Sequence, residues 1–305
     1  MRIAHYTITT TLLWLLANTV AACSMAISDS SRIAVAGGSL TEIIYLLNAQ
    51  QRIVALDTTS NFPAATQSLP SIGYVRNLSA EGILSMKPTA ILGEDDMGPP
   101  EVVKQLVAAG LSIAKVPEVY TPQGIIKKVR CVASLLQLQT QAEALITSQL
   151  QPVITTLNNY QRDHKPLKIA LLLGLRDGVP LAAGSNTSGD GFIKMINGHN
   201  VFASIEGWKP ISLESMASAN PDYIIIPQRG VDTAGGIDVI ANHLAVRLTN
   251  AGKHQRILVL DGMAMLGFSP RTLTTAETVL QQLQKTRVLN QRSTIDTQTP
   301  VKVGS

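Results

Sequence analysis

The sequence predicts an α/β protein with two Rossmann-like lobes that are joined by a rigid connecting α-helix. In two separate parts of the chain, short apolar runs alternate with helical patterns, which is typical of parallel sheets flanked by helices. Between these parts, residues 121–164 have no strand-like run and carry apolar residues at helical spacing. A short motif also occurs once in each part, which indicates that the lobes are built alike.

The first lobe is expected to span residues 27–139. Gly37-Gly38 turns its first strand into a helix, for which Ser39 and Glu42 have the spacing of a capping box. A further helix is expected at residues 101–109. The strands are expected at residues 32–36, 52–57, 89–93 and 112–116. This alternation predicts a parallel sheet.

The connecting helix is expected at residues 140–165. Pro152 lies within it, and an interior proline kinks or ends a helix, so the sequence leaves the continuity of this helix open. A helical connector limits hinge motion. We therefore expect the cleft between the lobes to be nearly preformed.

The second lobe is expected to span residues 166–290, with residues 291–305 as a flexible polar tail. Its strands are expected at residues 167–173, 223–227 and 256–261, and its helices at residues 187–196 and 272–284. Thr187 is expected to cap the first of these helices.

The composition excludes several classes of protein. Apolar residues make up 45% of the chain and charged residues 15%, which argues against disorder. The net charge of +4 comes with no cluster of basic and aromatic residues, so we expect no nucleic-acid partner. Signatures of hydrolases, nucleotide-binding enzymes and zinc proteases are missing, and we expect no enzymatic activity. The histidines lack metal-ligand spacing, so a zinc or manganese site is not expected.

The first 26 residues resemble a signal peptide. Ser24 and Ala26 offer small residues for cleavage, which would release a soluble protein into the periplasm. The alternative is that Val20-Ala21-Ala22-Cys23 is a lipobox and that Cys23 carries a lipid anchor. Either outcome leaves Cys131 alone, so we expect a buried, inert thiol and no disulfide within the chain.

The repeated motif combines a glycine–aromatic turn with a glutamate. The first copy starts at Gly73-Tyr74 and continues to Glu81, and the second starts at Gly207-Trp208 and continues to Glu214. In both copies the glutamate follows a serine by two positions and precedes a proline by seven. Two lobes that face each other with these turns would form a clamp.

Tyr74 is the candidate for ligand chemistry. A phenol is a poor ligand at its ordinary pKa of about 10, but a nearby cation favours the phenolate, which suits ferric iron. Arg76 stands two positions away and cannot lose its proton. Tyrosine is an established ligand of haem iron. Taken alone, an isolated tyrosine more often packs or hydrogen-bonds its ring, and these residues leave both roles open.

Several stretches together resemble the substrate-binding proteins of bacterial ABC haem importers. These stretches are residues 37–43, 57–60, 63–65, 73–82, 98–100 and 261–272. The resemblance extends over residues 32–289. It rests on the tyrosine motif in combination with the Gly-Phe-Ser-Pro-Arg-Thr stretch of residues 267–272, each of which would be weak alone.

This resemblance implies a helical-backbone periplasmic binding protein with ferric haem b in the cleft. Tyr74 would be the axial iron ligand, with Arg76 beside the phenolate. Glu81 and Glu214 would dock on the permease of an ABC transporter, which works with its ATPase and, upstream, with an outer-membrane haem receptor. A binding protein of the same fold for a ferric siderophore or cobalamin is the alternative.

Three further residues are candidates for the walls of the cleft. Trp208 occupies the place in the second lobe that Tyr74 takes in the first, so we expect it opposite Tyr74 and near the porphyrin. Arg229 follows a strand, where ligand sites of α/β proteins lie, and is a candidate partner of a haem propionate. Arg176 is a second such candidate. Some members of the family bind a second haem through a histidine, and residues 174–178 contain none.

Overall fold

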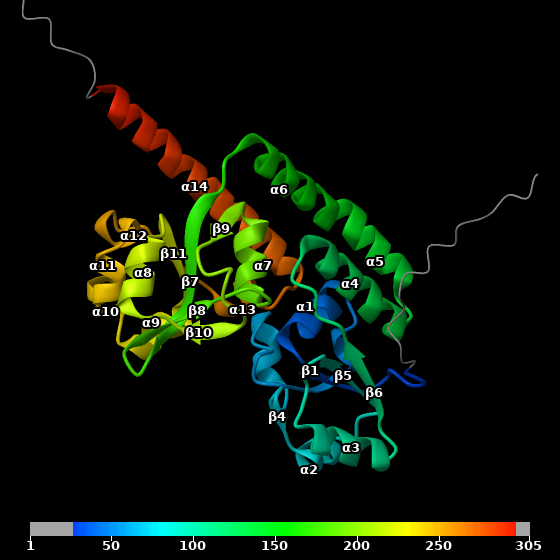
Figure 1. Ribbon diagram of the computed structural model, residues 1–305. Coiled ribbons are helices and arrows are strands. Elements are labelled where there is room, and N and C mark those ends of the chain that lie inside the picture. The colour runs from blue at the N-terminus through cyan, green and yellow to red at the C-terminus, as the bar shows by residue number, and fades with distance from the viewer. Residues whose placement is uncertain (1–26, 297–305) are drawn as a thin grey trace, which may run out of the picture.

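The computed structural model describes residues 27–296 and contains two α/β lobes that lie side by side (Figure 1). The predicted signal peptide, with Cys23, lies outside the described residues, as do residues 297–305 of the predicted tail. Within the described part of the chain, no helix combines the length and hydropathy that a membrane crossing requires.

The first lobe contains a parallel sheet, as predicted, with strand order β2-β1-β5-β6. Its strands are β1 (Ile33–Ala36), β2 (Ile53–Leu56), β5 (Ala90–Glu94) and β6 (Ser112–Val116). The strand β1 is completely buried, because a parallel sheet is covered on both faces. Helices of this lobe are α1 (Gly38–Leu46), α2 (Ala80–Ser85) and α3 (Pro100–Ala108), with the 3₁₀ helices η1 (Gln50–Arg52) and η2 (Ala64–Ser68). A short hairpin consists of β3 (Gly73–Tyr74) and β4 (Asn77–Leu78).

The predicted capping box at the start of α1 is wrong. The N-cap residue is Gly37, and no side chain caps this helix. Ser39 instead donates to Glu94, and Glu42 accepts hydrogen bonds from the second lobe. Both side chains are buried, so they bind tertiary partners in place of the helix end. Gly37 has a φ of 150°, and an added Cβ would lie 2.6 Å from the Glu94 side chain.

The connecting helix is continuous through Pro152. It consists of α5 (Gln139–Leu145), the π-helical turn η3 (Ile146–Leu150) and α6 (Gln151–Asp163), and it follows α4 (Pro122–Leu136). The wide turn η3 ends immediately before the proline-containing first turn of α6. A local π turn accommodates a proline that cannot donate to the preceding turn.

The second lobe contains a mixed sheet with strand order β10-β8-β7-β11-β12 and with β9 beside β7. The strands are β7 (Leu167–Arg176), β8 (Val179–Ala183), β9 (Gly198–Asn200), β10 (Trp208–Pro210), β11 (Tyr223–Pro227) and β12 (Ile257–Leu260). The pairs β7–β8 and β8–β10 are antiparallel, which the alternation of strands and helices did not predict. The helices are α7 (Ser188–Met195), α8 (Leu213–Ala219), α9 (Gln228–Ala234), α10 (Ile237–Asn242), α11 (Leu244–Arg247), α12 (Asn250–Lys253) and α13 (Gly262–Leu266).

The last helix, α14 (Pro270–Asp296), is longer than predicted. It continues past Asn290, so the expected start of a flexible tail at residue 291 is wrong as far as Asp296. The helix contacts α6, α1 and α4, and it therefore touches the first lobe and the connector (Figure 1).

One apolar core extends through both lobes. It contains residues of β1 and α1, residues of the connecting helices and of α14, and residues of β7 and β11. Each lobe has in addition a separate core on the other face of its sheet. Because the shared core includes the connector, a hinge motion would expose buried apolar surface. This packing agrees with the expected rigid connector.

The expectation of an isolated thiol at Cys131 is wrong. Cys131 lies in α4 and is disulfide-bonded, and the described residues contain no free cysteine. The expectation assumed that Cys23 would be removed or lipidated. Cys23 is the only other cysteine of the sequence, and it lies outside the described residues.

Candidate ligand-binding site

The β3–β4 hairpin places Tyr74 and Arg76 next to each other. Gly73 has a φ of 89°, which favours glycine, and Tyr74 pairs with Asn77 across the tight turn. The Tyr74 side chain is exposed, and its hydroxyl oxygen accepts a hydrogen bond of 3.0 Å from Nη1 of Arg76. This is the pairing of phenol and guanidinium that the sequence suggested.

Asp96 is a third member of this group, and sequence reasoning missed it. Its Oδ2 accepts a hydrogen bond of 2.6 Å from Nε of Arg76 and lies 2.5 Å from Nη2. Burial lowers the pKa of Arg76, but the hydrogen bond and the charge of Asp96 outweigh this effect and raise the pKa. Twenty positions separate the two residues, so no local pattern could reveal the pair.

The loop that carries Asp96 is held on two sides. The ammonium group of Lys115 donates to the carbonyl oxygens of Asp95 and Met97, each at 3.0 Å. The backbone of Gly98 donates to Val75 at 3.0 Å and accepts from Leu78 at 2.9 Å. The hairpin turn and the loop after β5 therefore form one hydrogen-bonded unit.

A buried lysine connects the two lobes beneath this region. The ammonium group of Lys128 lies 2.6 Å from Glu118 and donates to Ser39 at 3.0 Å. It also donates to the carbonyl oxygen of Gly267 in the second lobe at 3.3 Å. Ser39 in turn donates to Glu94 at 2.7 Å. One cation thus holds α1, α4, the loop after β6 and the end of α13 together.

Two carboxyl groups of this network have raised pKa values. Burial raises the pKa of Glu94 to about 7, although the nearby charge of Lys128 and the hydrogen bond from Ser39 act in the opposite direction. Burial also raises the pKa of Glu118, again against the effect of Lys128. A single ammonium group compensates two carboxylates only in part.

A second ionic contact between the lobes involves Arg271. Its guanidinium donates to Oε1 of Glu42 at 3.1 and 2.6 Å, and Ser269 donates to Oε2 at 2.6 Å. The guanidinium also stacks on Phe62, with 4.1 Å to the ring centroid. Arg271 therefore joins the lobes.

Tyr120 lies where the lobes meet and was also missed. Its ring contacts Phe268 edge-on at 5.2 Å, and it packs so closely on α7 that an added Cβ on Gly191 would lie 2.5 Å from it. Tyr120 remains 36% exposed, so part of its ring is available to a ligand.

The three residues of the second lobe that were predicted to line the cleft differ in their burial and in their neighbours. Trp208 is half-buried and contacts the start of α7, where an added Cβ on Gly189 would lie 2.9 Å from its ring. Arg229 and Arg176 are exposed. Arg229 precedes Gly230, and Arg176 lies two positions after Gly174. The backbones of these two glycines touch, since an added Cβ on Gly174 would lie 3.2 Å from Gly230.

The two glutamates occupy equivalent places in the two lobes. Ser79 caps α2 and Ser212 caps α8, and Glu81 and Glu214 lie in the first turns of these helices. Both are exposed. A hydrogen bond from its own backbone and one from Ser212 lower the pKa of Glu214. The repeat found in the sequence is therefore also a repeat of structure.

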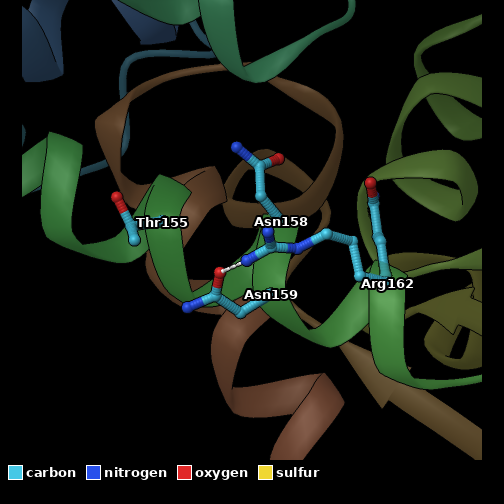
Figure 2. Close-up of a pocket in the computed structure, with 5 residues that line it drawn as sticks. Thr155, Asn158, Asn159 and Arg162 are labelled. Atoms are coloured by element: carbon cyan, nitrogen blue, oxygen red, sulfur yellow. Dashed lines mark hydrogen bonds between the residues drawn. The ribbon is translucent and has the colours of Figure 1, made fainter.

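Neither a cluster of metal-binding side chains nor the surface hollow on α6 offers a second candidate site among the described residues. Among them, no group of three or more histidine, cysteine or acidic side chains could hold a metal ion. A shallow polar hollow lies on the exposed side of α6 (Figure 2). Its lining residues are Thr155, Asn158, Asn159, Gln161 and Arg162. They offer no aromatic surface and no anionic ligand, and they all belong to the connecting helix.

Residues 33–264 match the family model described as "Periplasmic binding protein". The chain belongs to this family. A relative of this periplasmic binding protein is the uncharacterized ABC transporter substrate-binding lipoprotein YvrC of Bacillus subtilis, which is 21% identical over 80% of the chain and 77% of the relative. Another is the vitamin B12-binding protein of Pectobacterium atrosepticum, which is 25% identical over 72% of the chain and 77% of the relative.

Among solved structures, the protein is similar to periplasmic haem-binding proteins. RhuT from Roseiflexus sp. RS-1 has a TM-score of 0.78 and 33% identity, over 83% of this chain and 97% of that one. HutB of Vibrio cholerae has a TM-score of 0.76 and 34% identity, over 84% and 99%. BhuT in complex with two haems has a TM-score of 0.79 and 28% identity, over 84% and 99%. The whole two-lobed architecture is shared with these proteins.

Proposed function

We propose that this protein binds haem between its lobes and delivers it to an ABC transporter of the inner membrane for uptake of haem and iron. The observation that carries the proposal is the hydrogen bond of 3.0 Å from Arg76 to the hydroxyl oxygen of the exposed residue Tyr74. The similarity to haem-binding proteins of known structure, at 33% and 34% identity, supports the same ligand.

Tyr74 would bind the iron of ferric haem b as a phenolate. The side chain is exposed, so its oxygen can approach a planar ligand. The Arg76 guanidinium donates to this oxygen and places a positive charge beside it, which would suit a charged donor atom. A charged, hard oxygen is the donor that ferric iron prefers.

The remaining groups would bury the porphyrin and neutralise its propionates. Tyr120 and Phe62 are exposed aromatic residues of the first lobe. Trp208, of the second lobe, would add aromatic surface there. Arg229 and Arg176 are exposed arginines that suit carboxylates through bidentate hydrogen bonds.

Glu81 and Glu214 would orient the loaded protein on the permease, which works with its ATPase. Their carboxylates are exposed on matching helices of the two lobes. Two separated charges at a rim steer association and fix the orientation of a complex more than they raise its affinity. The protein would act in the periplasm, either free or anchored through Cys23, downstream of an outer-membrane haem receptor. It would act as a carrier and not as an enzyme.

A titration of the purified protein with ferric haem tests this proposal. We expect the wild type to bind haem with the spectrum of a phenolate-ligated ferric iron. Tyr74→Phe should lose that spectrum, while Tyr45→Phe, a change on the half-buried face of α1, should keep it. A wild-type protein that binds no haem would overturn the proposal.

Cobalamin is the second candidate, because several relatives are vitamin B12-binding proteins at 24% to 25% identity. Calorimetric titration with cyanocobalamin separates the two ligands. Tight binding of cobalamin that does not depend on Tyr74, together with no uptake of haem, would favour this alternative.

A further inference from the structure

Asp96 has no role in the family resemblance, yet it makes the shortest contacts of the Tyr74 site. Its Oδ2 lies 2.6 Å from Nε and 2.5 Å from Nη2 of Arg76. The side chains of both residues are partly exposed, at 62% for Arg76 and 43% for Asp96. An exposed ion pair adds little to stability, so stabilisation of the fold is a weak explanation for this one.

Because the guanidinium of Arg76 is planar, its contact with Asp96 also determines where its other N–H groups point. The edge with Nε and Nη2 binds Asp96, and Nη1 donates to the Tyr74 oxygen at 3.0 Å. All five N–H donors of an arginine lie in one rigid plane. Once Asp96 fixes one edge of the guanidinium, the direction of the Nη1 donor is fixed as well.

Backbone hydrogen bonds hold Asp96 where its carboxylate can orient the guanidinium of Arg76. Lys115 binds the carbonyl oxygens on either side of Asp96, and Gly98 is hydrogen-bonded to Val75 in the hairpin turn. The carboxylate and the hairpin therefore move together. Without Asp96, the long side chain of Arg76 would have several exposed rotamers, and few of them would point at Tyr74.

We propose that Asp96 is a positioning residue of the Tyr74 site. It holds the Arg76 guanidinium so that Nη1 donates to the phenolate oxygen, and it thereby sets how strongly that oxygen binds the iron of haem. The inference rests on the proposed function. In many metal sites, residues that do not touch the metal orient its ligands through hydrogen bonds and tune how strongly those ligands bind.

The first test measures haem release from the loaded protein. Asp96→Asn keeps the shape of the side chain and removes its charge. We expect haem to transfer to an acceptor protein about 10-fold faster than from the wild type, with a changed ligation spectrum. Asp96→Glu should release haem more slowly than Asp96→Asn, because it keeps the negative charge. An Asp96→Asn protein with the release rate and spectrum of the wild type would overturn the inference.

A double-mutant cycle shows whether Asp96 acts through Arg76. In an Arg76→Ala background, Asp96→Asn should change neither the spectrum nor the release rate further. If it kept its full effect in that background, Asp96 would act by another route and the inference would be wrong. Thermal unfolding of each variant excludes a general loss of structure.

A measurement without haem separates this inference from the proposed function. In nitrogen-15 NMR spectra of the ligand-free protein, the Nε–H group of Arg76 should exchange slowly with water in the wild type and rapidly in Asp96→Asn. Fast exchange in the wild type would overturn the positioning role. Slow exchange in a wild-type protein that takes up no haem would overturn only the proposed function.

Discussion

The guanidinium of Arg271 in the second lobe donates two hydrogen bonds to a single carboxylate oxygen of Glu42 in the first lobe, at 3.1 and 2.6 Å. Glu42 is 4% exposed, and Arg271 and Ser269 together supply hydrogen bonds to both of its carboxylate oxygens. The contact lies at the junction of the lobes, beside the shared apolar core. It therefore couples the packing of one lobe to that of the other.

Removal of Arg271 should destabilise the protein strongly. Arg271→Leu leaves the buried carboxylate of Glu42 without its cation, and we expect a loss of about 3 kcal/mol in the free energy of unfolding. The control is Arg130→Leu, which breaks the exposed pair with Glu143 and should cost less than about 1 kcal/mol. Urea unfolding measures both. Equal losses would contradict the assigned role of Arg271.

Glu94 should make the stability depend on pH. Its pKa rises from 4.5 in the unfolded chain to about 7, so the folded protein binds more protons between these values. This contribution to stability is fully present below pH 4.5 and is lost as the pH rises through about 7. Glu94→Gln should therefore be more stable than the wild type at pH 8.5, by roughly 1–3 kcal/mol, and equal to it at low pH. A constant difference across the pH range would contradict the assignment.

Close packing of Tyr120 on α7 should make Gly191 intolerant of a side chain. A Cβ on Gly191 would lie 2.5 Å from both the backbone oxygen and the Cβ of Tyr120, so the junction of the lobes would have to move. We expect Gly191→Ala to cost about 1–3 kcal/mol. Gly82→Ala is the control, because its nearest contact is 3.5 Å away and it lies in a helix, where alanine is favoured. Thermal unfolding measures both variants. Equal melting temperatures of Gly191→Ala and Gly82→Ala would contradict this packing argument.

Loss of the two repeated glutamates should impair transport and leave ligand binding intact. We expect Glu81→Ala combined with Glu214→Ala to bind haem as the wild type does but to deliver it poorly to the permease in proteoliposomes. Glu101→Ala removes an exposed glutamate from the first turn of α3 and should have no effect. Normal delivery by the double variant would argue against docking through these residues.

Trp208 should report on the ligand. Once residues 1–26 are removed, it is the only tryptophan of the chain. If it lies near the porphyrin, bound haem should quench its fluorescence almost completely, and Trp208→Phe should bind haem more weakly by a few fold. Unchanged fluorescence on saturation would exclude this position for Trp208.

Much of the architecture could be predicted because it depends on local patterns. The buried strand β1 is a continuous apolar run, β5 begins with one, and the hairpin of Tyr74 begins at a glycine that adopts a positive φ. Ser79 and Ser212 cap their helices as serines before a helix commonly do. The antiparallel pairs that β8 forms with β7 and β10 were missed, because β10 has only three residues and the pairing of strands is not a local property.

The order of the elements, the helical connector, the repeated motif and the proximity of Arg76 to Tyr74 could all be predicted from the amino-acid sequence. They depend on neighbours along the chain. Three contacts became visible only in the folded chain: Asp96 binds Arg76, Glu42 binds Arg271 and not its own helix end, and Lys128 binds Gly267. Each of these pairs is separated by 20 to 229 positions. Buried polar groups take the partners that packing brings near them, and the spacing of residues along the chain does not contain that information.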